Sequence, residues 1–570
     1  MSRPTLRQAI SWQPDSLEAA AGVWDAAATD LHRDVEVLIR GVEGLHEHWR
    51  GSTAAAARTR MTGLTGEATR LARVFVAAAA VARSGAQSIG QRRDEVLAAV
   101  AAARAEGYPV ADDGTAHAPA PASEVMTSRA AELSITVAAA LDRLGVADED
   151  TARDLDAAFR IAEPAPTTAA GWPTGPAALV AGWPTLSQEA IAAQIAALSP
   201  EQRRQLVEAA PRQAGNTDGV PWPLRIAANR LNIAEAILTQ RGLLDRSAQD
   251  KARSELSGPL PAALTRGAGD PASQERVRAA LLSDPAIRAR AAAAHDRKVN
   301  ARIEFYQGLL ADVPDPTGRS ELPVPRQFIA FDPQRSSLIE LHGDLRTATN
   351  LGVLIPGLNT TLAGSAANVD TARRFTRAGG GRLAMISYLG GEFPTGTDLV
   401  SGIRQAAEPG YAERMAPRLV AFSADVKRTV DGTGRTIPVT YLGHSYGGSI
   451  LGTAERDGLT ADRTVYVAAA GAGVGVHGPG DWHNRNPDVR RFSMTAPLDW
   501  IEAVQGIPFG PHGADPDTMA GVIPLGTGRR ANGSPMMGPG AHSGVVNDPS
   551  DAWNNLLAVL LAGPEPRRPR

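Results

Sequence analysis

The sequence contains no cysteine among its 570 residues. This absence excludes disulfide bonds, cysteine-ligated zinc and a cysteine nucleophile. Aromatic residues are also scarce, at 5% of the chain, while alanine runs are frequent, which favours closely packed, alanine-rich helices. A large excess of charge is absent as well. The net charge is −3, so the composition gives no indication of a nucleic-acid partner.

Long hydrophobic runs are missing too. No run of about 18 apolar residues occurs, so we expect no membrane span. The longest candidate, VFVAAAAVA from Val74, lies between Arg73 and Arg83. The N-terminal residues lack the apolar core of a secretory signal. What remains is the composition of an ordinary globular protein, 43% hydrophobic and 21% charged, with a length that predicts two to four domains.

Two long helical patterns occupy the N-terminal part of the chain. Apolar residues recur at steps of three and four over residues 14–46 and again over about 52–105, and HWRGS separates the two patterns. Such stripes predict two helices joined by a short turn into an antiparallel hairpin. Because the apolar seam is narrow, we expect a helical partner or self-association. We assign the hairpin to residues 1–111, a linker to 112–123 and a mostly helical intermediate region to 124–320.

The pattern changes at about residue 321. Alternation in RQFIAFDPQRSSLIELHGDL predicts two strands that turn at DPQRSS. Beyond Asn350, short apolar segments alternate with helical ones, which predicts a mainly parallel α/β sheet, covered on both faces, with the hairpin as its antiparallel edge. We assign residues 321–570 to this domain. Its expected strands are 352–357, 382–390, 437–444, 463–471 and 490–496, and its expected helices lie near 365–377, 398–430, 446–457 and the C-terminus.

The segment IPVTYLGHSYGG, which begins at Ile437, contains the pattern G-x-S-x-G. Because the chain is rich in glycine, chance alone supplies such a pattern roughly 0.3 times, so the motif by itself is weak. Its context strengthens it: an apolar strand precedes Gly443 and a helical pattern follows Gly447. A strand-to-helix turn of this kind holds a nucleophilic serine in a strained backbone, which small neighbours permit. We therefore predict that Ser445 is a nucleophile; the alternative is an ordinary glycine-rich turn.

A serine nucleophile needs a base, and the base needs an orienting acid. In this type of fold the chain order is serine, acid, histidine. Asp499, three residues past a strand end, is the predicted acid, whereas Asp481 and Asp488 lie earlier, in a loop between strands. Two histidines follow Asp499. We predict that His542, in a loop shortly before the terminal helix, is the base. His512 is the alternative, as a loop histidine that bonds backbone or lines the substrate pocket.

Acyl transfer also requires two hydrogen-bond donors for the oxyanion. One predicted donor is the backbone N–H of Tyr446, the residue after the nucleophile. The other comes from the loop LGVLIPGLNTT, where Leu358 is the first choice and Asn359 the second. We expect neither a metal nor a cofactor, because DWHNRNPD, the best candidate for a metal site, has His483 but no second histidine at helical spacing.

With these residues in place, the C-terminal part resembles the α/β-hydrolase fold. More specifically, it is similar to an actinobacterial α/β-hydrolase family of largely unassigned function, with a GHSYG elbow, a strand-loop aspartate followed by an HGxDP-like stretch, and a C-terminal His-Ser. Here these read GHSYGG, APLDWIEAVQGIPFGPHGADP and AHSGVV, and the resemblance covers about 240 residues. Upstream, RQAGNTDGVPWPLRIAANRLN (212–232) is similar to a helical segment that precedes the hydrolase in that family.

The N-terminal hairpin resembles the WxG-motif substrates of type VII secretion. Trp49 and Gly51 stand at the turn between the helices, where that family carries its motif. YPVAD, from Tyr108 to Asp112, has the spacing of the family's export signal, although Pro109 disfavours a helix there. The resemblance implies export by a type VII route and a helical-hairpin partner. A cytoplasmic location and a hairpin that only packs on itself are the alternatives.

Together these features predict a serine hydrolase that cleaves a small-molecule or lipid ester, a carboxylesterase or lipase-like enzyme. The alternative is a binding protein linked to type VII secretion, in which the hydrolase domain is a non-catalytic scaffold. We expect neither a nucleic-acid partner nor a membrane span.

Overall fold

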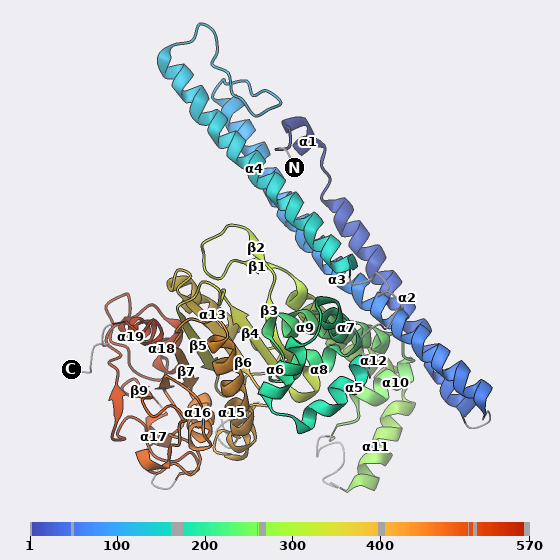
Figure 1. Ribbon diagram of the computed structural model, residues 1–570, viewed down its shortest axis with the longest axis vertical. Helices are drawn as coiled ribbons and strands as arrows, with labels where there is room; N and C mark the ends of the chain where they lie inside the picture. Colours follow the sequence, from blue (N-terminus) through green and yellow to red (C-terminus); the bar gives the residue numbers. More distant parts are fainter. Residues whose placement is uncertain are drawn as a thin grey trace. The chain divides into compact units, whose positions relative to one another are not determined.

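The computed structural model of the chain contains two compact units, whose helices and strands are drawn in Figure 1. It describes residues 3–46, 51–160, 175–258, 260, 270–396, 405–499, 501–505 and 510–563. The first unit comprises Met1–Thr168 and Ile233–Asp312, and the second comprises Ala169–Asn232 and Val313–Arg570. The region 124–320, predicted as one intermediate segment, is therefore shared between the two units.

The first unit is all helical. Its three longest helices are α2 (Asp15–His46), α3 (Ser52–Ala105) and α4 (Glu124–Arg160), and α2 and α4 both pack along α3. Gly51 precedes α3 with a φ of 114°, a conformation that favours glycine; Trp49 lies outside the described residues. The unit also contains α1 (Leu6–Ser11), the second half of α9 (Trp222–Leu244), α10 (Ala248–Glu255), α11 (Pro271–Ser283) and α12 (Pro285–Leu310).

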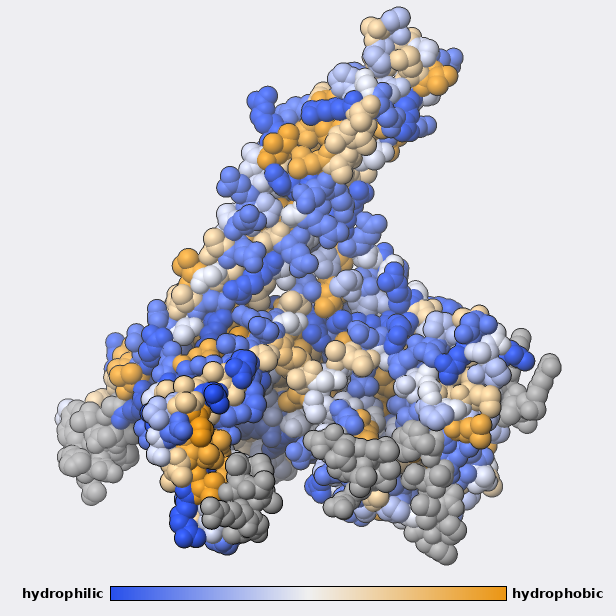
Figure 2. All heavy atoms as spheres, turned by 180° about the vertical axis from the view of Figure 1, so that it is seen from behind, coloured by the Kyte–Doolittle hydropathy of each residue, from blue (hydrophilic) through white to orange (hydrophobic). Residues whose placement is uncertain are grey.

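Apolar side chains are buried between the helices of this unit. Leu6, Val96 and Leu141 belong to a buried cluster that α1, α3 and α4 share. Some apolar side chains stay exposed on the same helices, such as Val37 on α2 and Ile135 on α4, and Figure 2 shows apolar residues scattered among polar ones along them. Within the described residues, none of the helices has the length and apolar character that a membrane crossing requires.

The segment after α3, predicted as an export signal and a linker, is packed against the helices of the first unit. Tyr108 is buried in a cluster with Ala103 of α3 and Leu133 of α4. Val110 and Ala116 form an isolated β-bridge. The chain therefore folds back on α3 and α4 here.

The second unit is built around an eight-stranded sheet with the order β10-β9-β8-β7-β5-β6-β4-β3. All neighbours are parallel except the β3–β4 and β4–β6 pairs. The predicted strand hairpin is thus the antiparallel edge. The strands are β3 (Gln327–Asp332), β4 (Ser337–His342), β5 (Asn350–Ile355), β6 (Leu383–Leu389), β7 (Val439–His444), β8 (Arg463–Val467), β9 (Arg490–Met494) and β10 (Val522–Pro524).

Helices cover the sheet because its central strands are mostly apolar. Every residue of β5 and β6 is buried, as expected for strands covered on both faces. Helices α13 (Ala366–Ala378) and α19 (Asp551–Leu560) share one buried cluster with these strands, while α16 (Tyr446–Arg456) contacts β7 and β8 and packs on α15 (Gly410–Asp431).

Most elements agree with the periodicity in the sequence. Strand β10 was not predicted, since three residues are too short for a pattern. The helix expected at 398–430 begins at Gly410, and residues 397–404 lie outside the described part. A two-stranded pair, β1 (Val313–Pro314) and β2 (Pro323–Val324), precedes the main sheet.

The segment 212–232 covers the edge strand β3. It belongs to a group of helices comprising α5 (Gly175–Gly182), η1 (Trp183–Thr185), α6 (Gln188–Ala196), α7 (Pro200–Ala209), α8 (Pro211–Asn216) and the start of α9. The Asn216 side chain exchanges two hydrogen bonds with the backbone of Phe331, at 2.9 and 3.1 Å. Asn229 Nδ2 donates to the Phe328 carbonyl at 3.0 Å. Polar side chains thus take the place of a neighbouring strand, which removes an unpaired edge.

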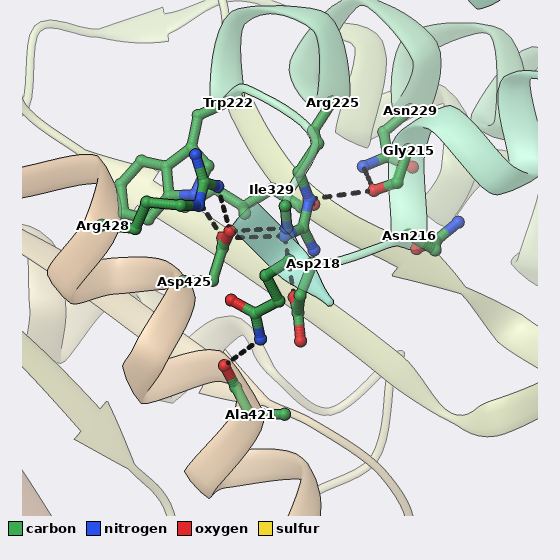
Figure 3. A network of polar contacts seen from close by, with 12 residues as sticks. Gly215, Asn216, Asp218, Trp222, Arg225, Asn229, Ile329, Ala421, Asp425 and Arg428 are labelled. Atoms are coloured by element: carbon green, nitrogen blue, oxygen red, sulfur yellow. Dashed lines mark hydrogen bonds and ion pairs between the residues drawn. The ribbon is translucent and has the colours of Figure 1, made fainter. Parts of the chain in front are cut away.

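Buried charges join this segment to α15, as Figure 3 shows. The Asp425 side chain is fully buried and accepts hydrogen bonds from the Gly219 N–H and Trp222 Nε1, both at 2.8 Å, and from Arg225 Nη1 at 3.0 Å. Arg428 is a further partner. Arg225 also donates from Nε to the Ile329 carbonyl of β3 at 2.8 Å. A buried carboxylate needs this degree of pairing, because desolvation otherwise costs several kcal/mol per charge.

Candidate active site

Ser445 stands at the turn between β7 and α16 in a strained backbone conformation. Its φ and ψ are 57° and −123°, a region that non-glycine residues rarely adopt. The Ser445 N–H donates to the Val467 carbonyl of the adjacent strand β8 at 3.0 Å, and its carbonyl accepts from the Gly448 N–H at 3.0 Å. The strand-to-helix turn therefore directs the serine side chain away from the sheet backbone, as a nucleophile requires.

The glycines around Ser445 are required by the lack of space. A Cβ atom on Gly443 would lie 2.5 Å from the Gly447 carbonyl oxygen, and one on Gly447 would lie 2.3 Å from the Ile355 carbonyl oxygen of β5. Both distances are shorter than van der Waals contact. The two glycines predicted as elbow residues thus permit the close approach of α16 to the ends of β5 and β7.

Three side chains predicted from widely separated segments form one hydrogen-bonded chain. Ser445 Oγ lies 3.0 Å from His542 Nε2, and His542 Nδ1 lies 3.1 Å from both carboxylate oxygens of Asp499. A carboxylate only accepts hydrogen bonds, so Nδ1 carries the proton and Nε2 accepts from the serine hydroxyl. Asp499 is buried, Ser445 is 6% exposed and the His542 side chain is 15% exposed. This arrangement suits a general base that removes the serine proton.

Local contacts hold the acid and the base. Asp499 follows β9 after Leu498, whose φ is 63°, and its Oδ1 accepts from the Ile501 N–H at 3.1 Å. His542 lies in α18 (Ala541–Asn547), a short helix where the sequence predicted a loop. A hydrogen bond of 2.8 Å from the Gly538 N–H to the Pro497 carbonyl links the two segments.

His444, the residue before the nucleophile, supports the base and was not predicted. Its Nε2–H donates to the His542 backbone carbonyl at 2.8 Å. Burial lowers the pKa of His444 to about 4. The ring is therefore neutral at physiological pH and places no positive charge beside the base. The sequence signal was the GHS tripeptide, which does not show that the histidine faces His542.

The loop after β5 lies next to the nucleophile. A Cβ atom on Gly357 would be 2.7 Å from Ser445 Cβ. The Asn359 N–H already donates to the Pro394 carbonyl at 2.9 Å, whereas within the described residues the Leu358 N–H donates to no backbone carbonyl. The Tyr446 N–H begins α16 and has no acceptor inside the helix. Leu358 and Tyr446 are therefore better candidates for oxyanion donors than Asn359.

His512 takes no part in the hydrogen-bonded chain of Ser445. It is buried, with Nδ1 2.8 Å from Ser449 Oγ and Nε2 2.6 Å from the Ala406 carbonyl. His483 is exposed and contacts the Arg456 carbonyl. Among the residues that the structure describes, no group of three or more His, Cys, Asp or Glu side chains is placed to hold a metal ion.

One comparison with known proteins gave a match. A family model described as alpha/beta hydrolase matches residues 332–508, a range that includes Ser445 and Asp499 and ends before His542. A search of curated proteins found no match. Together with the mainly parallel sheet, the match identifies the C-terminal part of the chain as an α/β-hydrolase domain, which supports a hydrolase activity in general.

Proposed function

We propose that this protein is a serine hydrolase that cleaves an ester through an acyl-enzyme on Ser445. The observation that carries the proposal is the chain of contacts from Ser445 Oγ through His542 to Asp499, with distances of 3.0 and 3.1 Å. The strained backbone of Ser445 supports it, because such strain persists where the surrounding structure enforces it and is typical of functional sites.

In the first half of the reaction, Ser445 Oγ attacks the ester carbonyl carbon while His542 Nε2 takes the hydroxyl proton. Asp499 stabilises the imidazolium that forms. The negative charge on the carbonyl oxygen is stabilised by the N–H groups of Leu358 and Tyr446, and one such donor contributes about 10²–10³-fold in rate. Collapse of the tetrahedral intermediate expels the alcohol, which leaves with the proton from Nε2.

In the second half, water attacks the acyl carbonyl and gives its proton to His542 Nε2. The second tetrahedral intermediate then releases the carboxylic acid, and the proton returns to Ser445 Oγ. We propose an ester as the substrate because an alcohol or phenol leaves with less assistance from a proton donor than an amine does. Small-molecule and lipid esters are both compatible with this chemistry.

A fluorophosphonate probe tests the proposal, because it reacts only with an activated serine. We expect the full-length protein to be labelled and Ser445→Ala to be unlabelled. Ser336→Ala is the matched control: Ser336 also has a positive φ, of 51°, but it lies in the turn between β3 and β4, where no histidine of the described residues hydrogen-bonds its side chain. A wild-type protein that stays unlabelled would favour the alternative, a non-catalytic scaffold linked to secretion.

The chain length of the acyl group is tested with p-nitrophenyl esters of increasing length. Hydrolysis of short esters alone would indicate a carboxylesterase, and a maximum at long chains would indicate a lipase-like enzyme. Ser445→Ala gives the background rate in both cases.

A further inference from the structure

The side chain of Tyr446, the residue after the nucleophile, is in contact with the start of α15. It is 1% exposed, and its ring packs edge-on against His512, with centroids 5.2 Å apart. The hydroxyl group donates to the Glu408 carbonyl and accepts from the Ala412 N–H at 3.3 Å. The backbone of Tyr446 is thus part of the turn between β7 and α16 that carries Ser445 (the nucleophile turn), while its side chain contacts the segment 405–412.

The contact with Ala412 has a structural reason. Helix α15 begins at Gly410, and the residue before it, Pro409, offers no side-chain acceptor. The first N–H groups of a helix lack partners within it and usually bond to a capping side chain. Here the Tyr446 hydroxyl replaces that cap. The Tyr446 hydroxyl therefore holds the start of α15 against the turn that carries Ser445.

His512 lies on a third segment of the chain and hydrogen-bonds both residues 405–412 and α16. Its Nε2–H donates to the Ala406 carbonyl at 2.6 Å, and its Nδ1 accepts from the Ser449 hydroxyl of α16 at 2.8 Å. Burial lowers the pKa of His512, which keeps the ring in the neutral form that can donate at one nitrogen and accept at the other. The backbone is held as well, because the His512 carbonyl accepts from the Gly473 N–H at 2.9 Å.

We propose that His512 and the Tyr446 hydroxyl form a clamp that holds residues 405–412 against the nucleophile turn and so fixes the Tyr446 N–H as an oxyanion donor. This inference rests on the proposed function. His512 is a positioning residue in it: it touches Tyr446 and its neighbours, and it acts on the reaction only through them.

The physical basis is the sensitivity of oxyanion stabilisation to geometry. A donor contributes only when it is within about 3 Å of the position that the oxyanion will occupy. A displacement of about 1 Å by a change outside the reacting groups can cost on the order of 10²-fold in rate. The ground-state substrate gains less from the same donor, so loss of the clamp lowers kcat more than it raises KM.

The test compares His512→Gln, Tyr446→Phe and the double variant in the full-length chain. Steady-state kinetics on a p-nitrophenyl ester give kcat and KM, and titration with a fluorophosphonate probe counts functional sites. We expect each single variant to lower kcat per functional site by about 10–100-fold and to leave KM within about threefold. We expect the kcat of the double variant to be about as low as that of the slower single variant and no lower, because each change opens the same clamp.

His483→Asn is the control, since His483 also bonds a backbone carbonyl but lies away from Tyr446; its kcat stays within about twofold of wild type. If His512→Gln does not fold, Ser449→Ala takes its place, because it removes only the hydroxyl that bonds His512 Nδ1.

Three results would contradict the proposed clamp without contradicting the proposed hydrolase activity. These are an unchanged kcat in the single variants, losses of activity explained entirely by fewer functional sites, and additive losses of kcat in the double variant. A wild-type protein that neither reacts with the probe nor hydrolyses esters would instead contradict the proposed function.

Discussion

At the scale of single residues, Ser445 combines a strained backbone with a side chain that contacts His542 Nε2. A non-glycine residue in such a conformation costs about 1–3 kcal/mol and persists only when its surroundings enforce it. The hydrogen bonds of Ser445 to Val467 and Gly448 and the space left by Gly443 and Gly447 supply that enforcement. The same contacts present Oγ to His542, so the strain and the proposed chemistry have one structural origin.

Replacement of Asp499 by Asn tests the role of the acid. The amide can donate to Nδ1 and thereby favours the wrong tautomer of His542, so we expect kcat to fall by on the order of 10⁴-fold with little change in the unfolding midpoint. Asp481→Asn, in the short 3-10 helix η3 (Pro479–Asp481), is the control. If Asp499→Asn kept more than a tenth of the wild-type kcat on a p-nitrophenyl ester, Asp499 would not be the orienting acid.

Replacement of Gly447 by Ala tests the space around the nucleophile turn. The added Cβ would lie 2.3 Å from the Ile355 carbonyl oxygen, and overpacking of this kind costs typically about 1–3 kcal/mol. We expect a loss of that size in the free energy of unfolding by urea, together with a loss of probe labelling. Gly480→Ala, where a Cβ meets no atom within 4 Å, should match wild type in both measurements.

At the scale of elements, the segment 212–232 covers the edge of the sheet at β3. It contributes none of the residues proposed for the reaction. Its side chains bond the free edge of β3, and its Gly219 N–H and the side chains of Trp222 and Arg225 are partners of the buried Asp425. We therefore expect this chain to need the segment for folding of its α/β-hydrolase domain.

Removal of the Asp425 carboxylate tests this element. Asp425→Ala leaves the Arg225 guanidinium buried with one carboxylate partner fewer, and breaking a buried pair in this way costs about 3–5 kcal/mol. Asp431→Ala, which removes an exposed pair with Lys427, should cost no more than about 1 kcal/mol. Urea unfolding followed by circular dichroism measures both; equal losses in the two variants would contradict a special role for the buried network.

At the scale of the whole molecule, residues 169–232 belong to the same compact unit as the hydrolase domain. The sequence placed the start of that domain at residue 321, so a fragment of residues 321–570 lacks Asn216, Arg225 and Asn229. We expect this fragment to be insoluble or to lack cooperative unfolding, because the edge of β3 loses these partners and the Asp425 carboxylate keeps Arg428 but loses its partners in segment 212–232. A folded fragment that reacts fully with a fluorophosphonate would show that the segment is dispensable.

The dependence of stability on pH is a second property of the whole molecule. Burial lowers the pKa of His342 on β4 to about 4, whereas a histidine in the unfolded chain titrates near 6.5. Between these values the unfolded chain binds a proton that the folded protein does not. This contribution to stability is therefore fully present above about pH 6.5 and is lost as the pH falls toward 4.

Urea unfolding at several pH values checks this. We expect the wild-type free energy of unfolding to fall between pH 6.5 and 4.5, and His342→Asn to show a smaller fall over the same range. The charged groups near the ring, Glu340, Arg326 and Arg373, are unchanged in that variant. Equal slopes in the two proteins would indicate that His342 is not responsible.

The sequence alone predicted the fold class and most strands and helices of the catalytic domain. Those elements follow from local periodicity and from turn residues, which are properties of neighbouring positions. It also named Ser445, Asp499 and His542, because the order of such residues along the chain is a consequence of strand order. The geometry that joins them, at 3.0 and 3.1 Å, required the sheet to be assembled.

The tertiary structure alone decided which distant polar groups meet. The contacts of His512 with Ser449 and Ala406, of Tyr446 with the start of α15, and of segment 212–232 with β3 join residues that lie 34 to 115 positions apart. Apart from the His512–Ser449 contact, which joins two side chains, each involves a backbone carbonyl or N–H group. Every residue carries these groups, so no pattern of side chains marks such contacts in the sequence. The sequence therefore determined which residues are candidates for the proposed chemistry, and the packing of helices on the sheet decided what holds them in place.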